Sequence, residues 1–179
     1  MGGLRDSWYL LSRSIVAAAA CSLFHTYGLQ AEQASGPSME PTLPSTGSLL
    51  LTWKVGRWLR QSRWLGSCIG EYKRGQVVLL KSPESGTLVC KRIVGVPGDT
   101  LYVLRGDRAD SSSEYPLFYN VETVNVPPGH IWVQGDNQPN SHDSRHYGCV
   151  SQGLIYSTVL LCLWPPTLSL ARPPPPCVS

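Results

Sequence analysis

The chain has 179 residues and a formal net charge of +3, and its composition is 42% hydrophobic and 15% charged. This length suits one ordinary domain with a short appendage and excludes two large lobes. The mild charge, without a long basic run, excludes the broad phosphate-binding footprint of a nucleic-acid-binding protein. The six cysteines form no Cys-x-x-Cys pair, so a metal site is not expected and their redox state stays open.

Residues 1–30 are predicted to form an N-terminal membrane anchor. Within them, residues 7–29 carry one formal charge, Arg13, and a spanning helix needs about 20 mostly apolar residues. Because the stretch is rich in alanine, a cleaved secretory signal or a mitochondrial targeting helix is the alternative. Arg5 and Arg13 precede the apolar core, so the N-terminus should stay in the matrix or cytoplasm while the rest crosses the membrane. Residues 30–36 are expected to be a polar exit.

Short runs of β-prone residues between turn residues predict a mainly β, antiparallel domain over residues 31–166. The expected strands lie at 49–53, 76–81, 88–94, 100–104, 121–126, 130–134 and 154–163. The second and third of these runs flank a turn-like segment and should form a hairpin. One helical turn is expected, either after Met39 or within residues 53–73.

Two segments fall outside this β pattern. Residues 53–73 carry a basic side chain at every third position among tryptophans: Lys54, Arg57, Arg60 and Arg63. This segment is interpreted as a solvated insertion with a short helix, and contact with lipid headgroups is the alternative. The tail at 167–179 contains four consecutive prolines and is expected to be disordered, because proline cannot join a packed sheet.

Ser38 stands in a loop directly after the predicted anchor, and Gly36, Pro37 and Pro41 restrict the backbone around it. A serine in such a loop is most often a turn residue. To act as a nucleophile its hydroxyl needs a base, because its own acidity is far too low at neutral pH. Counting alone leaves a histidine base open, with four candidates: His25, His130, His142 and His146.

Lysine is the other known base for a serine, since an amine in an apolar pocket loses its charged form to desolvation. Lys91 and Arg92 are neighbours in the apolar run 88–94, and the alternation of a strand should point them to opposite faces. One of the two must then face inward. The alternative is a pair of exposed basic residues on an edge strand.

Residues 135–148 are dense in Asn, Asp, Ser and Gly. Their default interpretation is a long turn whose side chains bond to their own backbone. Asp143 and Arg145 are two residues apart and can pair or brace neighbouring loops. Rigid polar loops of this kind often carry functional sites.

Taken together, three segments resemble type I signal peptidases, and most closely the mitochondrial inner membrane proteases, especially their first catalytic subunit. The matching segments are 38–42, 91–99 and 135–148, in the same order and with fitting spacing. The resemblance covers roughly residues 30–166. Each motif alone is weak, but three in order are specific.

The resemblance implies a serine endopeptidase that needs no cofactor and no metal. Ser38 would attack the scissile carbonyl, and neutral Lys91 would take its proton and later pass it to the leaving amine. The backbone N–H of Ser38 would donate to the oxyanion, while Gly36 stands where bacterial relatives often have a second, hydroxyl donor. Further residues are implied in support of the site (Ser141, Asp143, Arg145, Asp136 and Asn137) and in substrate binding (Met39 and Pro37).

The implied fold is a signal-peptidase-like antiparallel β domain with an N-terminal transmembrane helix, to which the precursor adds as an extended strand. The implied role is removal of sorting or signal peptides from precursors of the mitochondrial intermembrane space and inner membrane. The domain would face the intermembrane space, next to membrane lipid, and a second protease subunit is expected as partner. Three alternatives remain: a bacterial-type signal peptidase I, a self-cleaving repressor-type Ser-Lys protease, and a non-catalytic, membrane-tethered peptide-binding subunit.

Overall fold

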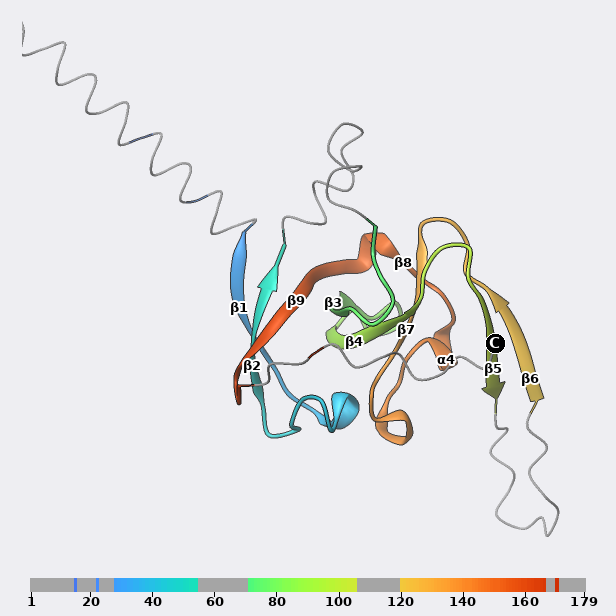
Figure 1. Ribbon diagram of the computed structural model, residues 1–179, viewed down its shortest axis with the longest axis horizontal. Helices are drawn as coiled ribbons and strands as arrows, with labels where there is room; N and C mark the ends of the chain where they lie inside the picture. Colours follow the sequence, from blue (N-terminus) through green and yellow to red (C-terminus); the bar gives the residue numbers. More distant parts are fainter. Residues whose placement is uncertain are drawn as a thin grey trace, which may run out of the picture.

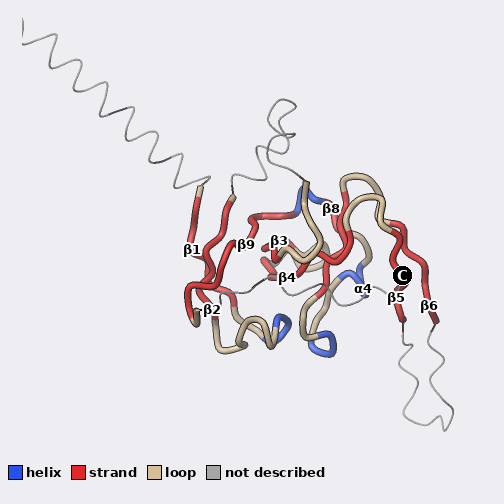
Figure 2. The backbone as a smooth tube through the Cα atoms, viewed as in Figure 1, coloured by secondary structure: helices blue, strands red, loops and turns tan. Residues whose placement is uncertain are grey.

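The computed structural model describes residues 28–54, 71–105 and 120–166, together with the single residues Ile15, Ser22 and Leu170. These residues form a seven-stranded antiparallel sheet that curls around its core, with a two-stranded ribbon beside it (Figure 1). Within residues 28–166, strands account for most of the described regular structure, and the described helical segments are single turns (Figure 2). The prediction of a mainly β, antiparallel domain is confirmed.

The strand order of the larger sheet is β1-β2-β9-β3-β4-β7-β8. Its strands are β1 (Leu29–Ala34), β2 (Ser48–Trp53), β3 (Val77–Lys81), β4 (Leu88–Gly95), β7 (His130–Gln134), β8 (Val150–Ser151) and β9 (Ile155–Trp164). The ribbon pairs β5 (Thr100–Arg105) with β6 (Asn120–Asn125). The short helical segments are η1 (Pro37–Met39), η2 (Gln138–Asn140), α4 (Ser144–Tyr147) and η3 (Gln152–Leu154).

Every strand predicted from the sequence is confirmed to within one residue at either end, and β3 and β4 form the predicted hairpin. The polar exit predicted at residues 30–36 is wrong, because β1 occupies most of it and pairs with β2 along its whole length. The polar side chains of β1 mislead here. They suit an edge strand that exposes one face to solvent.

The helical turns also differ from expectation. The turn predicted after Met39 lies instead at Pro37–Met39 and includes Ser38, since proline at the start of a helix has its φ already set. The long turn predicted at 135–148 contains η2 and α4. Helix α4 begins because the Asp143 side chain accepts from the backbone of the first turn, while His146 reaches back to the Asp143 backbone.

The core lies on both faces of the central strands. On β3, Val78 and Leu80 join one buried cluster, and Val77 and Leu79 join another on the opposite face. The sequence of a strand that is buried on both faces is a continuous run of apolar residues and does not alternate between apolar and polar residues. The middle of the sheet therefore offers no solvent-facing side for the polar residues of β4.

No helix among the described residues is long and apolar enough to cross a membrane. The anchor predicted within residues 1–30 falls almost wholly outside the described residues, and so does most of the basic segment at 53–73. Of the tail predicted at 167–179, only Leu170 is described.

Candidate active site

Ser38 is held in the single 3-10 turn η1, at the end of the connection from β1. Gly36 precedes it with φ of 113°, a left-handed conformation that glycine adopts without strain. The loop after β7 fastens this turn from the other side. The backbone N–H of Asn137 donates to the Ser38 carbonyl at 3.0 Å, and its side-chain Nδ2 donates to the Pro37 carbonyl at 3.0 Å.

Lys91 and Arg92 are both buried, with 3% and 1% of their surfaces exposed. At least one of them was expected to face inward, and both do. The alternative of two exposed basic residues on an edge strand is wrong, because neither side chain is exposed. Alternation points the two side chains to opposite faces, and each face is covered by other parts of the domain.

The Lys91 amine begins a chain of hydrogen bonds into the loop after β7. Its Nζ donates to Ser141 Oγ at 3.0 Å, and Ser141 Oγ donates to Asp143 Oδ2 at 2.6 Å. The same carboxylate accepts from the Gly135 backbone at 2.9 Å and pairs with the Arg145 guanidinium at 2.9 Å. Because Ser141 gives its only proton to Asp143, its oxygen can only accept from Lys91.

The environment shifts the pKa of the lysine and of the carboxylate downward. Burial lowers the pKa of Lys91 from its ordinary value, and the nearby Asp143 charge offsets only part of this effect. Burial alone raises the pKa of Asp143, but hydrogen bonds from Arg145, Ser141 and Gly135 outweigh it, so the net pKa is lowered. The cluster thus combines a stable carboxylate with an amine that gives up its proton more easily than an exposed lysine does.

Arg92 belongs to a second buried cluster, with Asp136; Asp136 was predicted from the sequence to support the site, whereas Arg92 was not. Its guanidinium donates to both oxygens of Asp136, at 2.7 and 2.6 Å. A third nitrogen donates to the backbone carbonyls of Gly75 and Leu170, at 2.7 and 2.6 Å. The signal available in the sequence was the Lys-Arg doublet inside an apolar strand.

Gly135 lies between the serine turn and the lysine cluster. A Cβ atom added to it would overlap Ser141 Oγ and the Ser38 carbonyl oxygen. The turn η1 also packs against strand β4. The predicted nucleophile and the hydrogen-bond partner of the predicted base are therefore separated by little more than one glycine backbone.

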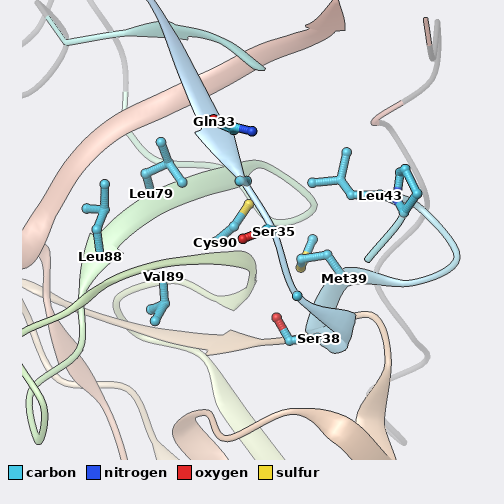
Figure 3. Close-up of a pocket in the computed structure, with 12 residues that line it drawn as sticks. Gln33, Ser35, Ser38, Met39, Leu43, Leu79, Leu88, Val89 and Cys90 are labelled. Atoms are coloured by element: carbon cyan, nitrogen blue, oxygen red, sulfur yellow. The ribbon is translucent and has the colours of Figure 1, made fainter. Parts of the chain in front are cut away.

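A pocket of about 230 Å³ opens beside Ser38, whose hydroxyl points toward the wall formed by Val89 and Cys90 (Figure 3). Its lining comes from the end of β1, the serine turn, β3 and β4: Gln33, Ala34, Ser35, Gly36, Ser38, Met39, Leu43, Pro44, Leu79, Leu88, Val89 and Cys90. Met39 is among the lining residues, but Pro37 is not. Burial raises the pKa of Cys90 to about 12, so its thiol stays protonated and does not compete as a nucleophile.

The described histidines make their hydrogen bonds away from Ser38. His142 Nε2 lies 2.7 Å from Glu84 Oε2, and His130 Nδ1 lies 3.1 Å from the Pro128 carbonyl. His146 Nδ1 accepts from the Asp143 backbone at 3.3 Å. His25 is outside the described residues. None of these hydrogen bonds of the described histidines involves Ser38.

Known proteins match this chain over most of its length. A family model described as signal peptidase, peptidase S26, matches residues 7–108 and 105–164. The mitochondrial inner membrane protease subunit 1 of Schizosaccharomyces pombe is 41% identical over 150 residues, which cover 83% of this chain and 82% of that protein. The mitochondrial ATP-independent inner membrane protease subunit 1a of Arabidopsis thaliana is 39% identical over 157 residues, covering 86% and 82%.

A solved structure, a signal peptidase I from Enterococcus faecalis, aligns with 51% of this chain and 98% of its own, at 25% identity and a TM-score of 0.39. The sequence relatives confirm the resemblance that three segments of the chain predicted.

Proposed function

Since this chain belongs to the signal peptidase family, peptidase S26, and is a serine peptidase of that type, we propose that it cuts precursor proteins with Ser38 as nucleophile and Lys91 as general base. Removal of a sorting peptide requires a hydroxyl, a proton acceptor and an oxyanion donor at one place. The described residues offer candidates for all three.

The observation that carries the proposal is the buried Lys91 amine and its bond to Ser141. A neutral amine has two N–H donors and one lone pair. Because Ser141 accepts one N–H at 3.0 Å, it restricts the directions in which the lone pair can point. The proposed lone-pair target is the Ser38 hydroxyl, whose turn lies across Gly135 from Ser141.

The proposed reaction follows from these positions. Lys91 takes the proton of Ser38 while Ser38 Oγ forms a bond to the scissile carbonyl carbon. The resulting ammonium keeps its hydrogen bond to Ser141, and the Asp143 charge favours it. The ammonium then gives its proton to the leaving amine as the peptide bond breaks, which leaves an acyl ester on Ser38 for water to hydrolyse.

The oxyanion donor is proposed to be the backbone N–H of Ser38. It lies in the first turn of η1, where backbone N–H groups have no partner within the helix. A preorganised donor at this position is worth most when negative charge develops on the carbonyl oxygen. At Gly36 this chain has no hydroxyl side chain to serve as a second donor.

The precursor is proposed to bind as an added strand along β4. Strand β3 pairs with β4 from Leu88 to Arg92, whereas β7 pairs with β4 only from Arg92 onward. Among the described residues, no strand pairs with the other edge of residues 88–91. An extended peptide can bond to such an edge, and its side chains would reach the pocket beside Ser38.

The location and partner are proposed from the relatives, which are named as subunits of mitochondrial inner membrane proteases. We place this chain at the same membrane, with its catalytic domain facing the intermembrane space and precursors with cleavable sorting peptides as substrates. A second protease subunit is the proposed partner.

The test begins with the mature N-termini of inner-membrane and intermembrane-space proteins, compared between cells with and without this chain. A precursor identified in this way is then offered to the full-length wild type and to the Ser38→Ala and Lys91→Met variants. Both variants are expected to lose cleavage. Lys81→Met serves as the control, because Lys81 is an exposed lysine of the same hairpin. If Ser38→Ala or Lys91→Met cuts at the wild-type rate, the dyad assignment is wrong.

A further inference from the structure

Thr42, in the segment that follows the serine turn, has a partner far away in the sequence. Its Oγ1 donates to Asp136 Oδ2 at 2.5 Å, across a separation of 94 residues. Just beside it, the Leu43 backbone N–H donates to the Met39 carbonyl at 2.9 Å. The hydroxyl of Thr42 therefore ties the downstream end of the serine turn to the loop after β7.

The carboxylate that accepts from Thr42 is the same one that holds Arg92. Both guanidinium bonds to Asp136 are short, at 2.7 and 2.6 Å, and Arg92 is 1% exposed. Arg92 is also the residue directly after Lys91 on β4. One buried carboxylate thus connects the segment of Ser38 with the strand of Lys91.

We propose that Thr42 is a positioning residue, which sets the Ser38 hydroxyl relative to the Lys91 amine through Asp136 and Arg92. This inference rests on the proposed function, since it matters only if Ser38 and Lys91 react together. A displacement of about 1 Å between reacting groups lowers a rate by about 100-fold. Asn137 still holds the upstream part of the turn at Pro37 and Ser38, so loss of Thr42 releases one end only.

A positioning role differs from a binding role or a purely structural role in what it changes. Thr42 is not among the pocket-lining residues, so substrate affinity should not depend on its hydroxyl. Lys91 bonds to Ser141 and not to Asp136, so the pH at which activity rises should not move. The effect should fall on kcat alone.

The experiment compares full-length wild type with Thr42→Val, Thr42→Ser and Thr52→Val on an internally quenched peptide that spans an identified cleavage site. Thr42→Val keeps the side-chain shape and is expected to lower kcat about tenfold while KM changes less than about twofold. Thr42→Ser keeps the hydroxyl and should restore kcat to within about threefold of wild type. The pH midpoint of activity should be the same in all of them.

Thr52→Val is the matched control, because the Thr52 hydroxyl likewise donates one hydrogen bond, to the backbone carbonyl of Gln30 at 3.2 Å, from a buried residue, whereas Thr42 is half-buried. It should lower the melting temperature while kcat per folded molecule stays at the wild-type value. A wild-type kcat in Thr42→Val, or an equal loss in Thr52→Val, overturns the positioning role. Ser38→Ala, measured in parallel, separates this outcome from failure of the proposed function, because activity in Ser38→Ala would refute the nucleophile itself.

Discussion

Two neighbouring cations on β4 are buried to nearly the same extent, yet they have very different partners. Arg92 meets the Asp136 carboxylate directly, through two hydrogen bonds of 2.7 and 2.6 Å. Lys91 donates instead to the neutral hydroxyl of Ser141 at 3.0 Å. The Asp143 carboxylate does not bond to Lys91 in the described structure; it accepts a hydrogen bond from Ser141 instead.

Under the proposed function, the hydrogen-bond partner, and not burial alone, separates a structural basic residue from a reactive one. A carboxylate in direct contact would favour the charged form of the amine and keep it protonated. With a hydroxyl between the amine and the acid, the effect of burial outweighs the attraction of the Asp143 charge, and the pKa of Lys91 is lowered. Arg92 instead uses its fixed fork of donors to join three segments of the chain.

The largest expected effect tests this comparison by removing each cation in turn. Arg92→Met should lower the free energy of unfolding by about 3–5 kcal/mol, because it leaves Asp136 buried without its counter-charge. Lys91→Met should change it by less than about 1 kcal/mol, because an apolar side chain replaces a poorly solvated amine. Denaturant unfolding of both variants and of the wild type measures the two values.

The effects on activity should be in the opposite order, with the larger loss in Lys91→Met and the smaller loss in Arg92→Met. Lys91→Met should remain folded and inactive, while the residual activity of Arg92→Met should follow its folded fraction and the placement of Ser38. Equal losses of stability in the two variants would mean that both cations serve the fold in the same way.

The next effect sharpens the role of the intervening hydroxyl. Ser141→Ala should lower kcat by about 10- to 100-fold, because the amine then loses the bond that orients its lone pair. Ser144→Ala is the control from the same loop, since its buried Oγ accepts from the Val133 backbone at 3.0 Å. This control should lose about 1–3 kcal/mol of stability through an unsatisfied N–H and keep its kcat. A similar fall of kcat in both variants would reduce Ser141 to a structural residue.

The sequence predicted the strands well because β-prone runs and turn residues repeat regularly from residue 49 to residue 163. It predicted Ser38 and Lys91 through ordered motifs, and not through their surroundings. Alternation placed Lys91 and Arg92 on opposite faces but could not say that both faces are covered. That outcome depends on the clusters packed around β3, which are set by long-range pairing.

The remaining errors have similar causes. The polar residues of β1 gave no apolar signal, because an edge strand can leave one face in water. The contact between Thr42 and Asp136 spans 94 residues, and no local pattern marks it. Helix α4 could have been predicted from the sequence, since Asp143 is a favoured residue to begin a helix. In the polar loop this capping signal was taken for a turn.

The pH dependence of activity gives a further test of the lysine. Because the pKa of Lys91 lies below its ordinary value of 10.5, activity should rise with pH through that lowered value. A variant lacking His130, His142 and His146 should keep the same rise in a pH profile of kcat/KM. Loss of the rise in that variant would assign the base to a histidine.

The same pKa has a consequence for stability. Between the lowered pKa and 10.5, the unfolded chain binds a proton at Lys91 that the folded chain does not. The free energy of unfolding should therefore rise with pH in this window, by at most about 1.4 kcal/mol per pH unit. Lys91→Met lacks this contribution, so its stability relative to the wild type should fall as the pH rises.

The smallest expected effect comes from the exposed pair next to the site. His142 and Glu84 lie 2.7 Å apart, but their side chains are 58% and 54% exposed. Water screens such a pair, so Glu84→Gln should change the free energy of unfolding by less than about 0.5 kcal/mol. Its kcat should equal that of the wild type, because His142 bonds to neither Ser38 nor Lys91 in the described part of the chain. A clear fall of kcat would show that the turn between β3 and β4 helps to hold the Ser141 loop, and that the proposed base depends on surface contacts as well as buried ones.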